Sequence, residues 1–277
     1  MTTSRSALAA LIADRLDRDR DVLKAAWDAS GPVLHVVVDD LLPSGIAHEI
    51  AAAFPPRHVM GGYNSLKERK RIGVAMDAYP AILKEITFAF QDPRVLRATE
   101  AVTGIAPLNA DANLYSSGLS SMGEGDFLNP HIDNSGNPLL GQYRRINTLY
   151  YVSPEWDPAW GGVLELWDGN RANPRDVEPR FNRLVLMNTN RRSYHSVRPV
   201  RGCGARTRNC VSNYYFSPVS PEGYDYSHVT SFRGRPEQPV RDLWLRLDAA
   251  ARELYRKVRP RTPASVKHKY QGQDRPT

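Results

Sequence analysis

Short apolar runs dominate the middle of the chain, and each has about the length of a β-strand. They are separated by glycine, proline and asparagine and not by long helical repeats. β-branched and aromatic residues bounded by turn residues are typical of strands. The runs lie at 146–152, 161–167, 183–187 and 194–197. This pattern predicts a mainly β fold with flanking α-helices, a jelly roll or cupin-like barrel, whose core occupies residues 108–217.

Apolar residues recur at helical spacing on both sides of this region. Residues 6–29 place leucines and Trp27 three or four positions apart, and Gly31-Pro32 follows, so we expect one helix there. The other expected elements are a strand at 33–38, a short helix from Ser44, two helices within 80–105 separated at Asp92-Pro93, a strand at 108–115 that enters the barrel, and a last helix at 239–258.

Three segments lack a clear period. Residues 57–79 contain a basic cluster with Lys67, Arg69 and Arg71. We expect a solvated loop there, and the alternative is a lid that recruits an anionic substrate. Residues 218–238 are expected to form a loop, and residues 259–277, which are basic and rich in proline, a disordered tail. The expected organisation is one domain, 1–258, with parts 1–107, 108–217 and 218–258.

Composition is ordinary for a globular protein. The 277 residues are 41% hydrophobic and 24% charged, which suits one substantial core. The net charge of +7 is spread along the chain without a nucleic-acid module, so we expect no nucleic-acid partner. No apolar run has membrane-spanning length and no signal peptide is evident, so no membrane partner is expected. Two cysteines, Cys203 and Cys210, favour a reducing, cytoplasmic environment.

The chemistry-bearing residues begin with His131-Ile132-Asp133. Side chains two apart on a strand point to the same face, so His131 and Asp133 would lie together. With His195 they would form the two-histidine, one-carboxylate triad that holds non-haem Fe(II) and leaves positions open. A His-x-Asp tripeptide alone is common on protein surfaces. Glu165 is a competing carboxylate, which we expect to be an ordinary polar residue on a strand face.

The order of the surrounding blocks is far more specific than the triad. About 90 residues of this chain resemble the prolyl-hydroxylase branch of the Fe(II)/2-oxoglutarate-dependent oxygenases, which fold as a double-stranded β-helix. The blocks are His131-Ile132-Asp133-Asn134, Leu149-Tyr150-Tyr151, Trp156-Asp157, Gly161-Gly162-Val163-Leu164, residues 177–184, Arg191-Arg192-Ser193-Tyr194-His195, and Arg208 with Tyr214-Tyr215-Phe216.

The resemblance implies a cofactor and cosubstrate site. Fe(II) would be held by His131, Asp133 and His195, with 2-oxoglutarate and O2 as cosubstrates. A basic residue pairs with the C5 carboxylate of 2-oxoglutarate in this family, because a buried carboxylate needs a partner. We expect Arg208, with Arg206 two positions away as the alternative. The remaining residues that the resemblance implies at this site are Tyr151, Tyr115, Leu164 and Tyr214.

The expected function is hydroxylation of an unactivated C–H bond with release of succinate and CO2. The expected substrate is a small molecule such as an amino-acid derivative or a natural-product intermediate. One alternative is a prolyl or other residue of a protein. Another is a non-catalytic cupin-like binding module, which is less favoured because such a module needs neither the triad nor the arginine. Related halogenases carry a small residue where this chain has Asp133, which argues against halogenation.

Overall fold

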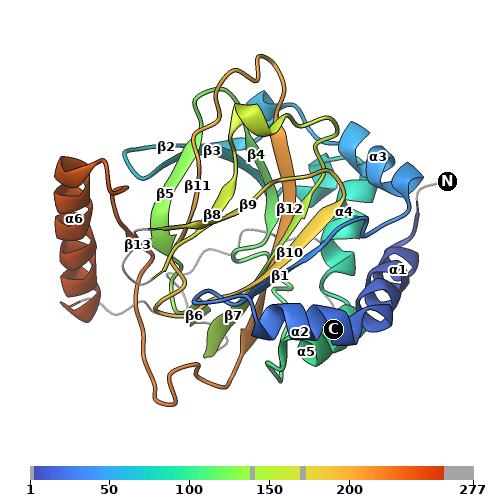
Figure 1. Cartoon of the computed structure of the whole chain (residues 1–277), viewed down its shortest axis with the longest axis horizontal. Helices are drawn as coiled ribbons and strands as arrows, with labels where there is room; N and C mark the ends of the chain where they lie inside the picture. Colours follow the sequence, from blue (N-terminus) through green and yellow to red (C-terminus); the bar gives the residue numbers. More distant parts are fainter. Residues whose placement is uncertain (1–2, 138–140, 169–172, 259–277) are drawn as a thin grey trace.

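One antiparallel sheet dominates the computed structural model, which describes residues 3–137, 141–168 and 173–258 (Figure 1). The sheet curls into a half-barrel, and its hydrogen-bonded order is β1-β10-β7-β12-β4-β3-β5-β11-β8-β9. The strands are β1 (His35–Val38), β2 (Gly61–Asn64), β3 (Glu68–Gly73), β4 (Gly118–Met122), β5 (Phe127–Ile132), β6 (Gly136–Asn137), β7 (Gln142–Tyr151), β8 (Leu164–Leu166), β9 (Arg175–Val177), β10 (Arg183–Asn188), β11 (His195–Val197), β12 (Arg208–Ser217) and β13 (Ser231–Phe232). The expected mainly β, double-stranded β-helix architecture is confirmed.

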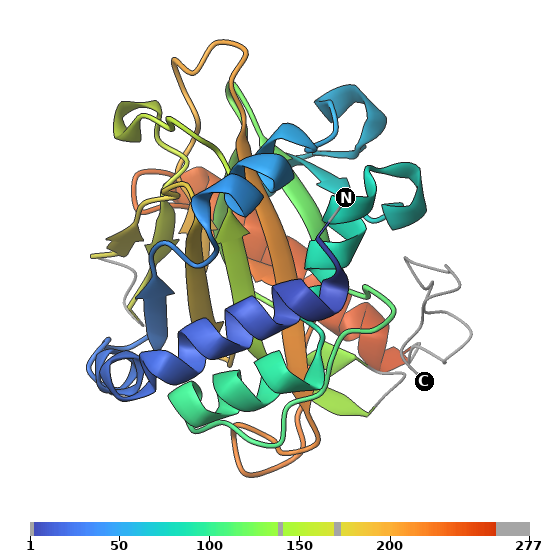
Figure 2. The ribbon, with the colours of Figure 1, turned by 90° about the vertical axis from the view of Figure 1, so that its right-hand side faces the viewer.

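A layer of helices covers the outer face of the larger part of the sheet (Figures 1 and 2). The helices are α1 (Arg5–Arg18), α2 (Arg20–Asp28), α3 (Ser44–Ala52), α4 (Ala81–Ala89) and α5 (Pro93–Thr103). The start of α5 illustrates their local causes: Asp92 accepts a hydrogen bond from the Arg94 N–H and Pro93 occupies the first turn. Its end is equally well defined, because Gly104 adopts the left-handed conformation, φ 69°.

Strand alternation divides the apolar side chains between two clusters. On β7, Tyr150 belongs to the large cluster beneath the helices, whereas its neighbour Tyr151 belongs to a smaller cluster inside the half-barrel. On β12, Val211 and Tyr215 face the helices. Each fully buried aliphatic side chain of the helix layer contributes about 1.5–3 kcal/mol to stability. The larger core therefore holds β7 and β12 rigidly, and their other faces are free to carry polar residues.

The last helix, α6 (Pro239–Val258), stands on the opposite side of the sheet from this layer, beside β13 (Figure 1). Its position agrees with the helix expected at 239–258. None of the helices in the described part of the chain combines the length and the apolarity that crossing a bilayer requires. The tail expected at 259–277 lies outside the described residues.

The prediction of one continuous helix over residues 6–29 is wrong. Residues 6–29 form two helices, because Asp19 leaves helical geometry at φ −102° and ψ 12°. Its carboxylate lies between the guanidinium groups of Arg15 and Arg18. The chain then changes direction, and α2 brings Leu23 and Trp27 to the core.

The prediction of a strand at 108–115 is also wrong. The carboxylate of Asp111 accepts hydrogen bonds from the backbone N–H groups of Tyr115, Ser116 and Ser117, each at 2.8 Å. These local bonds satisfy backbone donors that a sheet would otherwise use, so the chain turns. The strand begins only at Gly118, as β4.

Two further boundaries differ from the expectation. The segment 57–79 is not a loop, since β2 and β3 form a hairpin whose second strand pairs with β4 and β5. The strand expected at 161–167 is shorter, because Gly161 and Gly162 have φ angles of 73° and 69° and β8 begins at Leu164. Positive φ angles carry little steric cost for glycine and a larger one for residues with a Cβ atom.

Candidate active site

Two histidines face each other across neighbouring strands. β11 pairs antiparallel with β5, and His195 is the direct register partner of His131. The Nδ1 atom of each ring lies 3.0 Å from a backbone carbonyl oxygen, that of Asn129 for His131 and that of Ser193 for His195. When Nδ1 carries the proton and donates it to that carbonyl, Nε2 is left with a free lone pair. Both rings are thus prepared to bind through Nε2.

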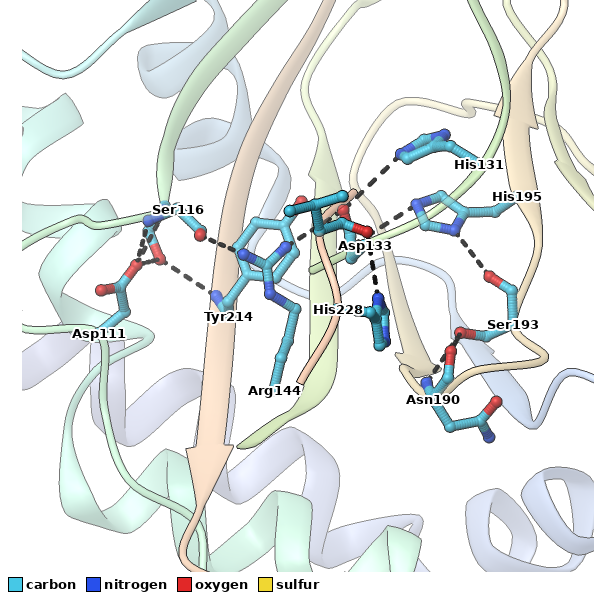
Figure 3. Close-up of polar contacts among 12 residues, drawn as sticks. Asp111, Ser116, His131, Asp133, Arg144, Asn190, Ser193, His195, Tyr214 and His228 are labelled. Atoms are coloured by element: carbon cyan, nitrogen blue, oxygen red, sulfur yellow. Dashed lines mark hydrogen bonds and ion pairs between the residues drawn. The ribbon is translucent and has the colours of Figure 1, made fainter. Parts of the chain in front are cut away.

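Asp133 completes a cluster with these rings (Figure 3). Its Oδ1 lies 3.7 Å from Nε2 of His131, and its Oδ2 lies 3.7 Å from Nε2 of His195. All three residues are buried or nearly so, and their ligand atoms lie within 4.8 Å of one another. The Nη1 atom of Arg144 lies 3.2 Å from Oδ1 of Asp133.

These donor atoms fit a metal ion. Oδ2 of Asp133 is buried and accepts no hydrogen bond from the described residues. A buried carboxylate oxygen without a donor is costly, and a cation would supply the missing partner. Two imidazole nitrogens and one carboxylate oxygen on one side of an ion are the donor set of non-haem Fe(II) sites with open positions.

The electrostatics keep the ligands in their binding forms. Burial, followed by the nearby His195, lowers the pKa of His131 to about 3, so its ring is neutral at physiological pH. Burial acts in the opposite direction on Asp133 and would raise its pKa. The guanidinium of Arg144 and the two histidines outweigh it, and the pKa of Asp133 falls below its usual range.

A buried guanidinium lies in the same cavity as the triad. The cavity encloses about 430 Å³ and is lined by His131, Asp133, His195 and Arg208 among others. Arg208 is only 3% exposed. Its Nη2 donates to the Tyr151 hydroxyl at 3.1 Å, and its Nε has no hydrogen-bond partner. Among the described residues no carboxylate forms an ion pair with Arg208, so the fork is available to an anionic ligand.

The alternative arginine lies elsewhere. Arg206 is exposed, does not line the cavity, and rests over the Trp160 ring at 5.1 Å. Glu165, the competing carboxylate, is buried but turned away from the metal ligands. It pairs with Arg235 at 2.6 Å and with Arg198 at 3.2 Å. Glu165 therefore ties the C-terminal segment to the barrel. It lies on a strand face, as expected, but its ion pairs make it more than an ordinary polar residue.

The other expected site residues either line the cavity or lie behind Arg208. Leu164, Tyr115 and Tyr214 line the cavity. Tyr151 does not line it, and instead lies behind Arg208, whose guanidinium carbon is 4.7 Å from the ring centroid. The structure thus brings all of the expected residues to one region, with Tyr151 contacting the arginine that would contact a ligand.

Sequence reasoning missed Arg144. Asn147 and Leu149 are two apart on β7, and both side chains line the cavity. Regular alternation would turn the side chain of Arg144 to the opposite face, away from the cavity. A bulge reverses it: Tyr215 pairs with Ile146 but Phe216 pairs with Arg144, which leaves one extra residue in β7. Arg144 then reaches Asp133 from above Tyr214, whose ring centroid is 4.2 Å from its guanidinium carbon. Nothing in the sequence pattern indicates this bulge.

Sequence reasoning also missed two contributions near the histidines. The Phe232 ring of β13 stacks on His131 with centroids 4.9 Å apart. His228, from the segment before β13, points toward Asp133 from the side opposite His131 (Figure 3). Both come from the segment expected to be a loop, where no period or motif distinguished them from surface residues.

The basic cluster of the β2–β3 hairpin is oriented away from the cavity. Lys67 pairs with Asp248 at 2.7 Å and Arg69 with Asp126 at 3.0 Å, while Arg71 donates to the Met60 carbonyl oxygen. The alternate positions of β3, which are Glu68, Lys70 and Ile72, line the cavity instead. Lys67, Arg69 and Arg71 therefore do not line the cavity, and their recruitment of an anionic substrate stays an untested alternative. The hairpin itself borders the cavity.

Gly162 packs against the side chain of Arg208. A Cβ atom at this position would lie 2.9 Å from Cδ of Arg208 and 3.3 Å from the Trp156 ring. Such a contact is shorter than side chains tolerate, and the left-handed backbone adds strain to any other residue. The Gly161-Gly162 pair thus leaves space for the aliphatic part of the Arg208 side chain.

Two histidines and a carboxylate meet on adjoining segments of a curled β-sheet, beside a buried guanidinium that pairs with no carboxylate of the described residues. This arrangement fits the class of non-haem iron oxygenases. Comparison with known proteins narrows this class. Residues 117–216 match the 2OG-Fe(II) oxygenase superfamily. This match covers 100 of the 277 residues, and the chain resembles the prolyl-hydroxylase branch of that superfamily, as the ordered motifs indicated. Fe(II), 2-oxoglutarate and O2 are what this family requires, in agreement with the expected cofactors.

Two curated relatives illustrate the similarity. Egl nine homolog 1 of Homo sapiens is 32% identical over 105 residues, which cover 38% of this chain and 23% of that protein. Prolyl hydroxylase EGLN3 of Mus musculus is 34% identical over 87 residues, covering 31% of this chain and 33% of that protein. The matched segments thus span a third or less of these relatives' own length.

A solved structure gives the corresponding comparison of folds. It is a prolyl hydroxylase from Trichoplax adhaerens in complex with a peptide fragment of the hypoxia inducible factor oxygen degradation domain. The TM-score is 0.54 at 18% identity, and the match covers 73% of this chain and 91% of that one. At this identity the likeness shows the fold.

Proposed function

We propose that this chain is an Fe(II)- and 2-oxoglutarate-dependent dioxygenase that hydroxylates a C–H bond of its substrate and releases succinate and CO2. One observation carries the proposal: the triad and the unpaired guanidinium of Arg208 face the same cavity of about 430 Å³. A metal site alone has many uses. A metal site with a buried receptor for a carboxylate matches the two ends of 2-oxoglutarate.

The site residues have separate roles in metal binding and in cosubstrate binding. His131, Asp133 and His195 hold the metal, and Arg144 fixes one carboxylate oxygen of Asp133. When bound, Fe(II) with 2-oxoglutarate and O2 supplies the oxidising power to functionalise an unactivated C–H bond. Arg208 would pair with the C5 carboxylate of 2-oxoglutarate.

The remaining residues support this arrangement. Tyr151 holds Arg208 through its hydroxyl. Burial raises the pKa of Tyr151, which keeps the hydroxyl protonated and polar without adding charge. Leu164 contributes an apolar wall and Tyr115 and Tyr214 contribute aromatic walls to the cavity.

For the substrate, we propose a prolyl-type residue of a protein or peptide. The support is the set of relatives, since the curated relative EGLN3 is a prolyl hydroxylase, and the structural relative is a prolyl hydroxylase in complex with a peptide. These relatives favour the peptidyl alternative over the small-molecule substrate first expected. The β2–β3 hairpin contributes Tyr63, Glu68 and Lys70 to the cavity wall, which gives a substrate chain polar groups to contact.

A screen for stimulated succinate formation tests both parts of the proposal. The purified protein with Fe(II) is given 2-oxoglutarate and a panel of proline-containing peptides, with free amino acids and their derivatives as a second panel. We expect succinate formation with a peptide and a product heavier by one oxygen atom, located at a prolyl residue by fragmentation. Stimulation by small molecules alone would refute the peptidyl substrate. The absence of 2-oxoglutarate turnover and binding would refute the oxygenase assignment.

A further inference from the structure

The last helix, α6, turns most of the charged side chains whose exposure is described toward its own protein, and Arg246 is the exception. Asp242 pairs with Arg233 at 2.8 Å, and Asp248 pairs with Lys67 of the β2–β3 hairpin at 2.7 Å. Arg252 donates to the Thr230 carbonyl oxygen at 2.9 Å. Leu245, on the same side, is 3% exposed. These contacts fix which face of α6 lies on the barrel.

The opposite face of α6 is apolar and open to solvent. Its large side chains are each between 55% and 71% exposed, and they are Val240, Leu243, Trp244, Leu247, Leu254 and Tyr255. The exposed Ala251 lies between them in sequence. We call these seven residues the α6 stripe. With about 60–120 Å² for an aliphatic side chain and more for an aromatic one, the stripe exposes on the order of 500 Å².

A contiguous apolar surface of this size marks an interaction site. The described residues outside α6 leave every large side chain of the stripe more than half exposed. A helix that served only to cover the barrel would place its charged residues outward and its leucines inward. The reversed orientation indicates that another surface covers the stripe.

The spacing of the stripe identifies the kind of surface. Val240, Trp244, Leu247, Ala251 and Leu254 follow one another at intervals of four, three, four and three. This alternation is the seam of a two-helix coiled coil, in which each side chain inserts between residues of a facing helix. No charged residue occupies a seam position. The occupant is therefore a second helix.

The stripe is also symmetric along the helix. Leu247, Trp244 and Leu243 stand 2, 5 and 6 positions before residue 249, and Ala251, Leu254 and Tyr255 stand 2, 5 and 6 positions after it. Reversing the helix places apolar positions on apolar positions. An isologous two-fold contact requires this self-complementarity.

We propose that α6 pairs antiparallel with α6 of a second copy of this chain, around a two-fold axis at the level of Ala249. Leu247 then packs on Ala251 of the second copy, and Trp244 packs on Leu254 of the second copy. Two stripes together bury about 1,000 Å², the size at which specific interfaces begin. None of the residues of the α6 stripe lines the cavity, so the proposal does not depend on the proposed enzymatic activity.

The mass of the full-length protein in solution is the first test. Light scattering coupled to size-exclusion chromatography, over a range of protein concentrations, should give the mass of two chains. Leu247→Glu places a charge in the seam and should raise the dimer dissociation constant at least 100-fold. Val22→Glu is the matched control, because Val22 is 74% exposed on α2, far from the stripe, and this variant should remain dimeric. A wild-type monomer at every concentration, or a dimeric Leu247→Glu variant, would overturn the proposal.

Cysteine cross-linking tests the orientation without relying on a destabilising change. The double variant Leu247→Cys with Ala251→Cys should form a covalent dimer on mild oxidation, because the two positions meet across an antiparallel pair. Leu247→Cys alone should link far less, and the native Cys203 and Cys210 are buried. Equal linking by the single variant would indicate parallel helices and overturn the proposal. So would a monomer that sediments with phospholipid vesicles, which would assign the stripe to a lipid surface.

Discussion

Replacement of Arg208 tests the cosubstrate site most directly. Arg208 is 3% exposed, and its nearest polar partner is a neutral hydroxyl. A 2-oxoglutarate carboxylate bound there would be desolvated, and removal of the partner of a buried charge costs about 3–5 kcal/mol. At 1.4 kcal/mol per tenfold, Arg208→Ala should weaken 2-oxoglutarate binding by roughly two to three orders of magnitude. Arg208→Lys keeps the charge without the fork and should fall between wild type and Arg208→Ala.

The measurement is an anaerobic titration of 2-oxoglutarate into the Fe(II) protein, followed by the metal-to-ligand absorption band. Arg206→Ala is the matched control, since this arginine is exposed and rests on Trp160 outside the cavity. It should bind 2-oxoglutarate as wild type does, and both variants should retain Fe(II). If Arg208→Ala kept its affinity while Arg206→Ala lost it, the assignment of the cosubstrate site would be wrong.

Three further outcomes are expected. Asp133→Ala should abolish the binding of a redox-inert divalent ion measured by calorimetry, and unchanged metal affinity would contradict the site. The variant should also lower the melting temperature of the metal-free protein, because Arg144 is left buried without its carboxylate. Lys70→Ala should raise the substrate KM about fivefold, the value of one hydrogen bond, and leave the KM for 2-oxoglutarate unchanged, whereas Arg71→Ala should alter neither, because only Lys70 lines the cavity. Burial lowers the pKa of His35, so below pH 6.5 the unfolded chain takes up a proton that the folded chain resists, and stability falls on acidification. Urea unfolding should show this loss reduced in His35→Gln relative to wild type, by up to about 1.4 kcal/mol per pH unit, and unchanged in a control at the exposed His58.

The residues that sequence reasoning placed well share one property: their positions follow from strand alternation within one continuous strand or from a spaced motif. His131 and Asp133 are two apart, and Arg208 and Tyr214 lie on the same face of β12, so a correct strand assignment brings them to the cavity. The register between β5 and β11, which joins His195 to His131, came from the resemblance to a family and not from the residues themselves.

The errors arise where local hydrogen bonding or a bulge changes the alternation. Asp111 diverts the backbone donors of three residues into a turn, which no periodicity reveals. The bulge in β7 turns Arg144 inward. In the β2–β3 hairpin the charged residues have low strand propensity, and tertiary partners such as Asp126 and Asp248 compensate for it. Which alternate face of the hairpin meets the cavity depends on partners far away in sequence.

If Arg208 binds 2-oxoglutarate as proposed, the absence of a side chain at position 162 makes that binding depend on a residue that does not itself line the cavity. A methyl group there would lie 2.9 Å from Cδ of Arg208 and would force that side chain to shift, and none of the three nearest atoms belongs to His131, Asp133 or His195. A homologous chain could therefore keep every recognised metal ligand and the arginine itself, and yet lose the receptor for 2-oxoglutarate through one added carbon atom. The glycine is therefore as informative as the metal ligands when homologous sequences are divided into active oxygenases and inactive homologues. A motif search that scores the ligands alone would misclassify that chain.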